Sequence, residues 1–173
     1  MLYLLTMLIL AIFCLILLWH LARGAAYVPT HPAKVEKIVA MAQVKPGEKA
    51  VDIGSGDGRI VIALARAGAE AHGYENNPLL VWWSRRKIKK AGLTGRTFIH
   101  MRSFWGADLS DYSIITVYGI DYIMRPLGNK LKKELHPGSR VLSYCFPLPG
   151  WTATRKETGI YLYSVSEPGG LSQ

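Results

Sequence analysis

The sequence predicts an α/β fold: a mostly parallel sheet with helices on both faces, a C-terminal antiparallel hairpin, and one transmembrane helix ahead of the domain. Three observations predict it. Apolar, β-rich runs alternate with helical segments, which is typical of parallel sheets. A glycine-rich turn joins the first such run directly to a helix. The first 21 residues contain no Asp, Glu, Lys or Arg.

The N-terminal apolar run, residues 1–23, matches the length of a membrane-spanning helix, which needs about 20 apolar residues. A cleaved signal peptide is the alternative, but its apolar core has only about 7–15 residues and follows basic residues. Basic side chains here come only at the end of the run, at Arg23, and after it, at Lys34 and Lys37. The positive-inside rule therefore predicts a single-pass membrane protein whose C-terminal domain is cytoplasmic. We favour a bacterial inner membrane because no Arg-rich transit segment precedes the run; the eukaryotic equivalent is the mitochondrial inner membrane, facing the matrix.

The rest of the chain is long enough for one domain with a core of its own. We expect residues 24–46 to form a linker, a helix and a lid, residues 47–166 the main domain, and residues 167–173 a disordered tail. The net charge is +9, and its densest basic cluster is Arg85–Lys90. We expect this cluster to contact anionic lipid headgroups. Nucleic acid is not expected as a partner, because no aromatic residues alternate with basic ones at strand spacing.

The order of elements follows from turn residues and apolar runs. Thr30-His-Pro32 offers a cap and a proline for a helix that extends to about Ala42. Later helices are expected at 59–67, 77–91 and 121–135, the last with a break near Gly128. Strands are expected around Ala50–Ile53, Glu70–Tyr74, Thr97–Met101, Ser113–Tyr118 and Arg140–Phe146, followed by a hairpin of Thr152–Glu157 and Ile160–Val165.

The glycine-rich turn predicts a nucleotide-type ligand at the carboxyl ends of the strands. The spacing is Gly-x-Gly-x-Gly at residues 54–58, whereas a dinucleotide fingerprint has Gly-x-Gly-x-x-Gly. Asp52 stands two residues ahead of the first glycine, where it would repel a pyrophosphate and attract an amino group. Glu75 ends the second strand, in position to accept hydrogen bonds from a ribose. A ribose with an amino-acid moiety and no phosphate describes S-adenosyl-L-methionine. Asp52 as a purely structural acid and Glu75 as a solvated strand end are the plainer alternatives.

These residues resemble a known family. Asp52–Gly58 together with Glu75 is similar to the cofactor motifs of class I S-adenosylmethionine-dependent methyltransferases. The strings Val51–Val61 and Gly73–Pro78, with Tyr27–Thr30, Phe104-Trp105 and Phe146–Trp151, more particularly resemble the membrane-anchored protein-lysine methyltransferases. Mitochondrial members of that group act on the ATP synthase c subunit and the adenine nucleotide translocase. The resemblance covers about residues 25–165 and implies a Rossmann-like methyltransferase sheet.

The resemblance implies a set of cofactor-binding residues. No metal is expected, because the five histidines, at positions 20, 31, 72, 100 and 136, lack the spacing of metal ligands. The expected contacts are Asp52, Gly54, Ser55, Gly56, Gly58, Glu75, Asn76, Ser103, Phe104 and Trp105. Such domains often carry an acid after the third strand for the adenine amino group, and Ser103 stands in its place here. Part of the adenine contact therefore passes to the backbone or to stacking on Phe104 or Trp105, although core packing is the alternative for both rings. Asp57 has two interpretations, a helix cap and a cofactor contact.

For catalysis, Tyr118 at the end of the fourth strand is the candidate to orient the acceptor amine. We expect a membrane-tethered methyltransferase of protein lysines, with a membrane protein as substrate. The alternatives are methylation of a lipid, quinone or other small acceptor, and a non-catalytic, cofactor-binding assembly factor.

Overall fold

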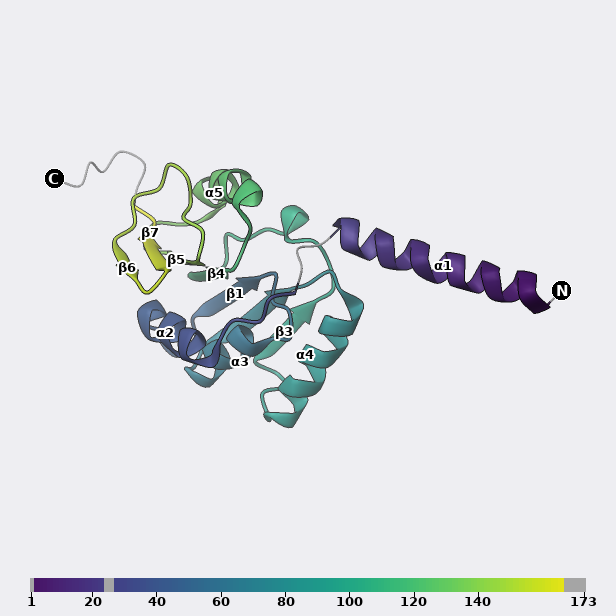
Figure 1. Ribbon diagram of the computed structural model, residues 1–173. Helices are drawn as coiled ribbons and strands as arrows, with labels where there is room; N and C mark the ends of the chain where they lie inside the picture. Colours follow the sequence, from purple (N-terminus) through teal and green to yellow (C-terminus); the bar gives the residue numbers. More distant parts are fainter. Residues whose placement is uncertain (1, 24–26, 167–173) are drawn as a thin grey trace.

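The computed structural model describes the backbone of residues 2–23 and 27–166, with side chains for 3–15 and 27–166. Seven strands form one sheet in the order β3-β2-β1-β4-β5-β7-β6 (Figure 1). Neighbouring strands from β3 to β5 are parallel, while β7 is antiparallel to β5 and to β6. The strands are β1 Lys49–Ile53, β2 Glu70–Tyr74, β3 Thr97–His100, β4 Ile114–Val117, β5 Arg140–Tyr144, β6 Arg155–Glu157 and β7 Ile160–Ser164. The predicted α/β sheet with a terminal antiparallel hairpin is confirmed.

Helices cover both faces of this sheet (Figure 1). Side chains of α2 (Pro32–Ala42), α3 (Arg59–Arg66) and α4 (Pro78–Lys90) pack into one core cluster. Those of α5 (Asp121–Glu134) pack into a second cluster. Along β1, Ala50 belongs to the first cluster and Val51 to the second, because successive side chains of a strand point to opposite faces. All four residues of β4 are buried, as expected for a central strand of a sheet with helices on both faces.

Two local predictions were wrong. Helix α5 is continuous through Gly128. The lack of a side chain at this position makes room for Trp151: a Cβ on Gly128 would lie 2.9 Å from the indole Nε1. A missing side chain here serves close packing and does not mark a helix end. The cap of α2 is His31, whose Nδ1 accepts a hydrogen bond from the Ala33 amide at 3.3 Å. Thr30 is instead buried beside the glycine turn, with its carbonyl bonded to Arg59.

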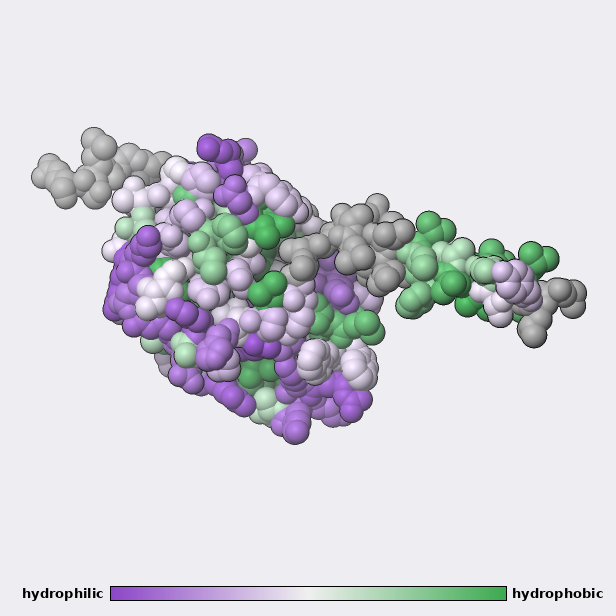
Figure 2. All heavy atoms as spheres, in the orientation of Figure 1, coloured by the Kyte–Doolittle hydropathy of each residue, from purple (hydrophilic) through white to green (hydrophobic). Residues whose placement is uncertain are grey.

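The N-terminal apolar run forms helix α1, Leu2–Arg23, which projects from the domain (Figure 1). Its apolar side chains between Tyr3 and Leu15 are exposed, and they form the green rod of Figure 2. Among the residues that the structure describes, no helix is both long enough and apolar enough to cross a membrane. The predicted transmembrane span is therefore not found there. The predicted disordered tail, 167–173, lies outside the described residues.

Candidate active site

A cavity of about 880 Å³ opens at the carboxyl ends of β1, β2 and β4. This is the edge of a parallel sheet where ligands of such folds bind, because the loops there diverge from one another. Nine of the ten cofactor residues predicted from sequence line the cavity: Asp52, Gly54, Ser55, Gly56, Glu75, Asn76, Ser103, Phe104 and Trp105. Tyr118, the predicted catalytic residue, lines it as well.

The loop between β1 and α3 brings bare backbone to the cavity. Gly54 and Gly56 have φ angles of 75° and 54°, values that only glycine adopts without strain. Ser55 lies between them, and its side chain points away from the loop surface toward β2, since a Cβ on Gly73 would lie 2.6 Å from its hydroxyl oxygen. Within the described residues that hydroxyl has no hydrogen-bond partner. A ligand would therefore meet Ser55 through its main chain.

Asp52 is a buried carboxyl group at the floor of the cavity, 3% exposed. Its Oδ1 accepts a hydrogen bond of 2.7 Å from the Thr116 hydroxyl on the adjacent strand β4. Burial raises its pKa to about 7; the Thr116 hydrogen bond opposes this shift, and the charges of Glu75 and Asp57 add to it. A buried carboxyl group with no cation beside it is suited to a cationic ligand, whose charge would stabilise the ionised form.

Glu75 binds the glycine loop from the end of β2. One carboxylate oxygen accepts from the Gly56 amide at 2.9 Å, and the other accepts from the Asn77 amide at 2.7 Å. Two backbone donors fix the direction of the carboxylate, which keeps further lone pairs for hydroxyl donors in the cavity. Asn77 in turn caps α4 through its own side chain. Glu75 thus joins the glycine loop to the start of α4.

Asp57 is a buried acid that pairs with two cations, a role that goes beyond the helix cap considered from sequence. Its carboxylate is 2% exposed and pairs with Arg59 and Lys87. Burial alone would raise its pKa, but the hydrogen bonds from these two cations outweigh burial and lower the pKa to about 2. Arg59 also donates to the Thr30 carbonyl at 2.6 Å and to the Tyr27 hydroxyl at 3.3 Å. The ion pair therefore fastens the segment 27–30 to the glycine loop.

The segment 27–30, part of the region where a lid was predicted, lies at the cavity. All four of its residues line the cavity. The ring of Tyr27 lies over the loop, because a Cβ on Gly56 would be 3.0 Å from its Cε2. The sequence analysis predicted a lid, but it did not predict that Arg59 holds this segment by hydrogen bonds to Tyr27 and Thr30. The signal that could have found it is an arginine directly after the glycines, next to a buried acid.

Gly58 is the one predicted cofactor residue that does not line the cavity. It is the N-cap of α3, with φ 78°, and it faces helix α4. A Cβ at this position would lie 2.9 Å from the Cβ of Ser84. Its lack of a side chain lets α3 and α4 approach each other, so its contribution to the site is indirect.

The short helix η1, Phe104–Gly106, forms the wall beyond β3. It is capped by Ser103, whose hydroxyl oxygen accepts from the Trp105 amide at 3.3 Å. The rings of Phe104 and Trp105 lie 4.5 Å apart between centroids, and Trp105 is 42% exposed. Sequence reasoning did not predict this helix, because three residues are too few to show a period.

The opposite wall is apolar and aromatic. Tyr118 follows β4 and lies beside Tyr144 at the end of β5, with 4.8 Å between ring centroids. Burial raises the pKa of the Tyr118 phenol, so it stays protonated at neutral pH. Tyr144 itself does not line the cavity; besides Tyr118, the residues of this wall are Gly119, Ile120, Tyr122, Ile123 and Phe146. Among the described residues, no group of three or more His, Cys, Asp or Glu side chains is arranged to hold a metal ion.

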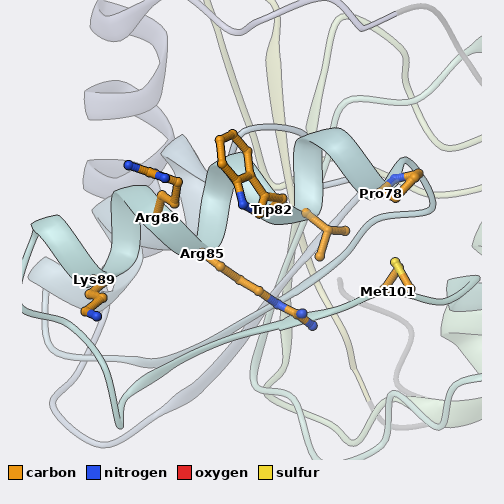
Figure 3. A pocket seen from close by; sticks show the side chains of 7 residues that line it. Pro78, Trp82, Arg85, Arg86, Lys89 and Met101 are labelled. Atoms are coloured by element: carbon orange, nitrogen blue, oxygen red, sulfur yellow. The ribbon is translucent and has the colours of Figure 1, made fainter.

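The basic cluster Arg85–Lys90 lies on α4, outside this cavity. Some of its side chains line a second, shallower groove of about 290 Å³ (Figure 3). Pro78 lines that groove, while Asn77 and Leu80 line the main cavity, so the two hollows share the N-terminal end of α4 as a rim.

Comparison with known proteins agrees with the geometry. Residues 52–155 match the ANTKMT methyltransferase domain, which covers more than half of the chain. The chain belongs to this methyltransferase family. The predicted class I S-adenosylmethionine-dependent methyltransferase family is thereby confirmed. The segment matched runs from Asp52 through the start of β6, and so contains the glycine loop and both walls of the cavity.

Several relatives of this chain are named as lysine N-methyltransferases. The rat lysine N-methyltransferase of the ATP synthase c subunit is 44% identical over 126 residues, 73% of this chain and 58% of that protein. A protein-lysine N-methyltransferase of Saccharolobus islandicus is 34% identical over 151 residues, 82% of this chain and 94% of its own length. The chain spans about half the length of the mammalian relatives that it matches.

A solved structure shares most of this fold. The RNA methyltransferase from Salinibacter ruber, in complex with S-adenosyl-L-homocysteine, is 31% identical, with a TM-score of 0.78. The match covers 84% of this chain and all of that one.

Proposed function

We propose that this chain is an S-adenosylmethionine-dependent methyltransferase of protein lysines that works at a membrane. The observation that carries the proposal is the convergence of Asp52 and Glu75 on one cavity beside an exposed glycine backbone. Membership of the methyltransferase family supports the reaction class. The names of the relatives support lysine as the acceptor.

The cavity suits the cofactor by its charges. The Asp52 carboxylate attracts an amino group and repels phosphate, which disfavours a dinucleotide. The Glu75 carboxylate, fixed by two amides, accepts from ribose hydroxyls. Arg59 lines the cavity, but its guanidinium already donates hydrogen bonds to Asp57, Thr30 and Tyr27 and is therefore not free to bind a phosphate. A homologue bound to S-adenosyl-L-homocysteine supports the same cofactor here.

When bound, S-adenosyl-L-methionine supplies an activated methyl group to an acceptor nitrogen. The residues around it hold the acceptor in line and exclude water. A lysine amine has a pKa of about 10.4 in water, and an apolar wall lowers that value by disfavouring the ammonium form. The oxygen of the protonated Tyr118 phenol can orient the neutral amine by accepting one of its N–H groups, which leaves the nitrogen lone pair free for the methyl group. The proton that the methylated nitrogen then releases goes to solvent outside the closed site.

Membrane attachment is the second half of the proposal, and α1 supports it. The exposed apolar side chains from Tyr3 to Leu15 lack any covering by the domain. Burial of such a surface in lipid is strongly favourable. Confinement to the same bilayer would raise the effective concentration of a membrane-protein acceptor. The domain would face the cytoplasm of a bacterium, or the matrix if the source is eukaryotic, as the flanking charges predict.

One other acceptor has an observation in its favour. The homologue from Salinibacter ruber is an RNA methyltransferase by name, and α4 of this chain carries a dense run of basic residues. RNA is therefore the second candidate. Its binding would weaken steeply with salt.

The test incubates full-length protein with membranes, total RNA and radiolabelled S-adenosyl-L-methionine. We expect label in a protein band that yields methyl-lysine on acid hydrolysis. Label in the lipid extract, in RNA, or nowhere would contradict the lysine assignment. The variant Asp52→Asn should lose the label, and the exposed Asp111→Asn serves as its matched control. Membrane attachment is tested separately: the full chain should stay in the pellet after alkaline carbonate washing.

A further inference from the structure

The groove on the outer side of α4 combines charge with exposed apolar surface (Figure 3). Three of its residues are cations within about one turn of the helix, Arg85, Arg86 and Lys89. The remaining lining is Pro78, Val81, Trp82 and Met101. Arg85 extends across the groove toward β3 and donates to the Ile99 carbonyl at 2.8 Å, which holds its guanidinium over the hollow.

The groove cations have no acidic partner among the described residues, because none of the ion pairs there involves Arg85, Arg86 or Lys89. Lys87, in contrast, turns inward and pairs with Asp57. Helix α4 contains no acidic residue at all. The guanidinium of Arg86 lies over the Trp82 ring, 4.9 Å from its centroid. This uncompensated charge fits an anionic partner.

Apolar exposure distinguishes a lipid surface from nucleic acid. Leu79 is 75% exposed, Trp82 59% and Met101 58%. A tryptophan could stack on a base, but exposed Leu and Met side chains cannot, and they gain stability only by leaving water. Figure 2 shows hydrophobic surface over the N-terminal end of α4, on the side of the domain from which α1 extends. Tryptophan and basic residues beside aliphatic ones are typical of membrane interfaces.

We propose that the α4 groove binds anionic phospholipid headgroups and docks the domain on the bilayer surface. Arg86 and Lys89 contact headgroup phosphates, while Leu79, Trp82 and Met101 enter the interface. The groove and the main cavity share a rim at Pro78–Leu80, so docking turns the cavity mouth toward the bilayer. The inference deepens the proposed function by naming the surface at which the acceptor is met, and it rests on that function for its purpose.

Hydroxyl-radical footprinting of the full-length protein tests this docking side chain by side chain. The protein is placed in nanodiscs of phosphatidylcholine alone or of phosphatidylcholine mixed with phosphatidylglycerol. Attachment through α1 would be the same in both discs. We expect oxidation of Trp82 and Met101 to fall severalfold only in the anionic discs. The double variant Arg86→Gln/Lys89→Gln should weaken docking on the order of 30-fold and abolish the protection.

The matched control is Arg125→Gln/Lys133→Gln, which removes the same charge from exposed positions of α5, on the other face of the sheet. Equal protection in neutral discs, or loss of protection in the control variant, would overturn the proposal. Protection by total RNA that exceeds protection by anionic discs would assign the groove to RNA instead. The footprint needs no methyl transfer, so failure of the lysine assay with an intact footprint would count against the proposed function alone.

Discussion

The carboxylate of Asp52 and the hydroxyl of Thr116 are joined by a 2.7 Å hydrogen bond between the adjacent strands β1 and β4. The two residues are register partners in the parallel ladder, so the sheet itself sets their separation. Thr116 is the single polar residue of β4, in Ile-Ile-Thr-Val. It provides the hydrogen bond that partly offsets the burial of Asp52.

Affinity for S-adenosyl-L-methionine should depend on the ionisation of Asp52. Burial raises the pKa of this group to about 7, and a cationic amino group binds its ionised form. Binding should therefore weaken roughly tenfold for each pH unit below 7, and change little from pH 7 up to the pKa of the cofactor's own amino group, about 8. Calorimetry from pH 5.5 to 8.5 measures the slope. The Asp52→Asn protein should bind the cofactor weakly, with an affinity that does not change between pH 5.5 and 7. If its affinity still fell below pH 7, the titration would belong to another group.

The same shift predicts a pH-dependent stability of the cofactor-free protein. The carboxyl group has a higher pKa folded than unfolded, so the folded state holds the proton more tightly. Its contribution to stability is full below pH 4 and is lost as the pH rises through 7. Between pH 5.5 and 8 the free energy of unfolding of the wild type should fall by about 2 kcal/mol relative to that of Asp52→Asn. Urea unfolding at both pH values tests this, and equal losses in the two proteins would refute it.

Glu75→Gln should impair the glycine loop as well as the cofactor contact. A glutamine has one acceptor oxygen, whereas Glu75 uses both oxygens, on the amides of Gly56 and Asn77. One amide would then face an NH₂ group. We expect cofactor affinity to fall about 10- to 100-fold, in line with the loss of a hydrogen bond to a charged group. Glu70→Gln, at the other end of β2, should leave the dissociation constant unchanged.

Replacement of Tyr118 by Phe separates binding from turnover. The ring and its contact with Tyr144 remain, and only the hydroxyl that orients the acceptor is removed. We expect kcat to fall about tenfold, with no change in cofactor affinity. Tyr144→Phe is the control, because Tyr144 does not line the cavity. Unchanged turnover in Tyr118→Phe would show that the hydroxyl has no part in the reaction.

Gly58→Ala should destabilise the fold by about 1–3 kcal/mol through overpacking and backbone strain. The added methyl would lie 2.9 Å from the Cβ of Ser84, at a φ angle of 78°. In the double variant Gly58→Ala/Ser84→Gly the steric part is relieved, and the remaining neighbours lie at least 3.6 Å away. A double-mutant cycle by chemical denaturation should therefore show favourable coupling. Additive losses would mean that the helices α3 and α4 move apart to accept the methyl.

Local signals in the chain were enough for most elements. The strand Glu70–Tyr74 and the hairpin at the C-terminal end of the sheet follow from short-range patterns, and both are present. Gly128 was misread, because a glycine that admits a tryptophan has the same local appearance as one that ends a helix. Gly58 was placed in the cofactor site because its spacing matches Gly54 and Gly56, although it faces a helix that lies further along the chain.

Local patterns in the chain are enough to predict which acids and glycines meet at the end of the sheet, because the order of strands and turns is encoded locally and parallel strands share one carboxyl edge. Which groups support those acids depends on the packing of the folded chain. Thr116, Arg59 and Lys87 reach the site from different elements. Their contacts depend on strand register and helix packing, which arise only once distant parts of the chain are buried against one another.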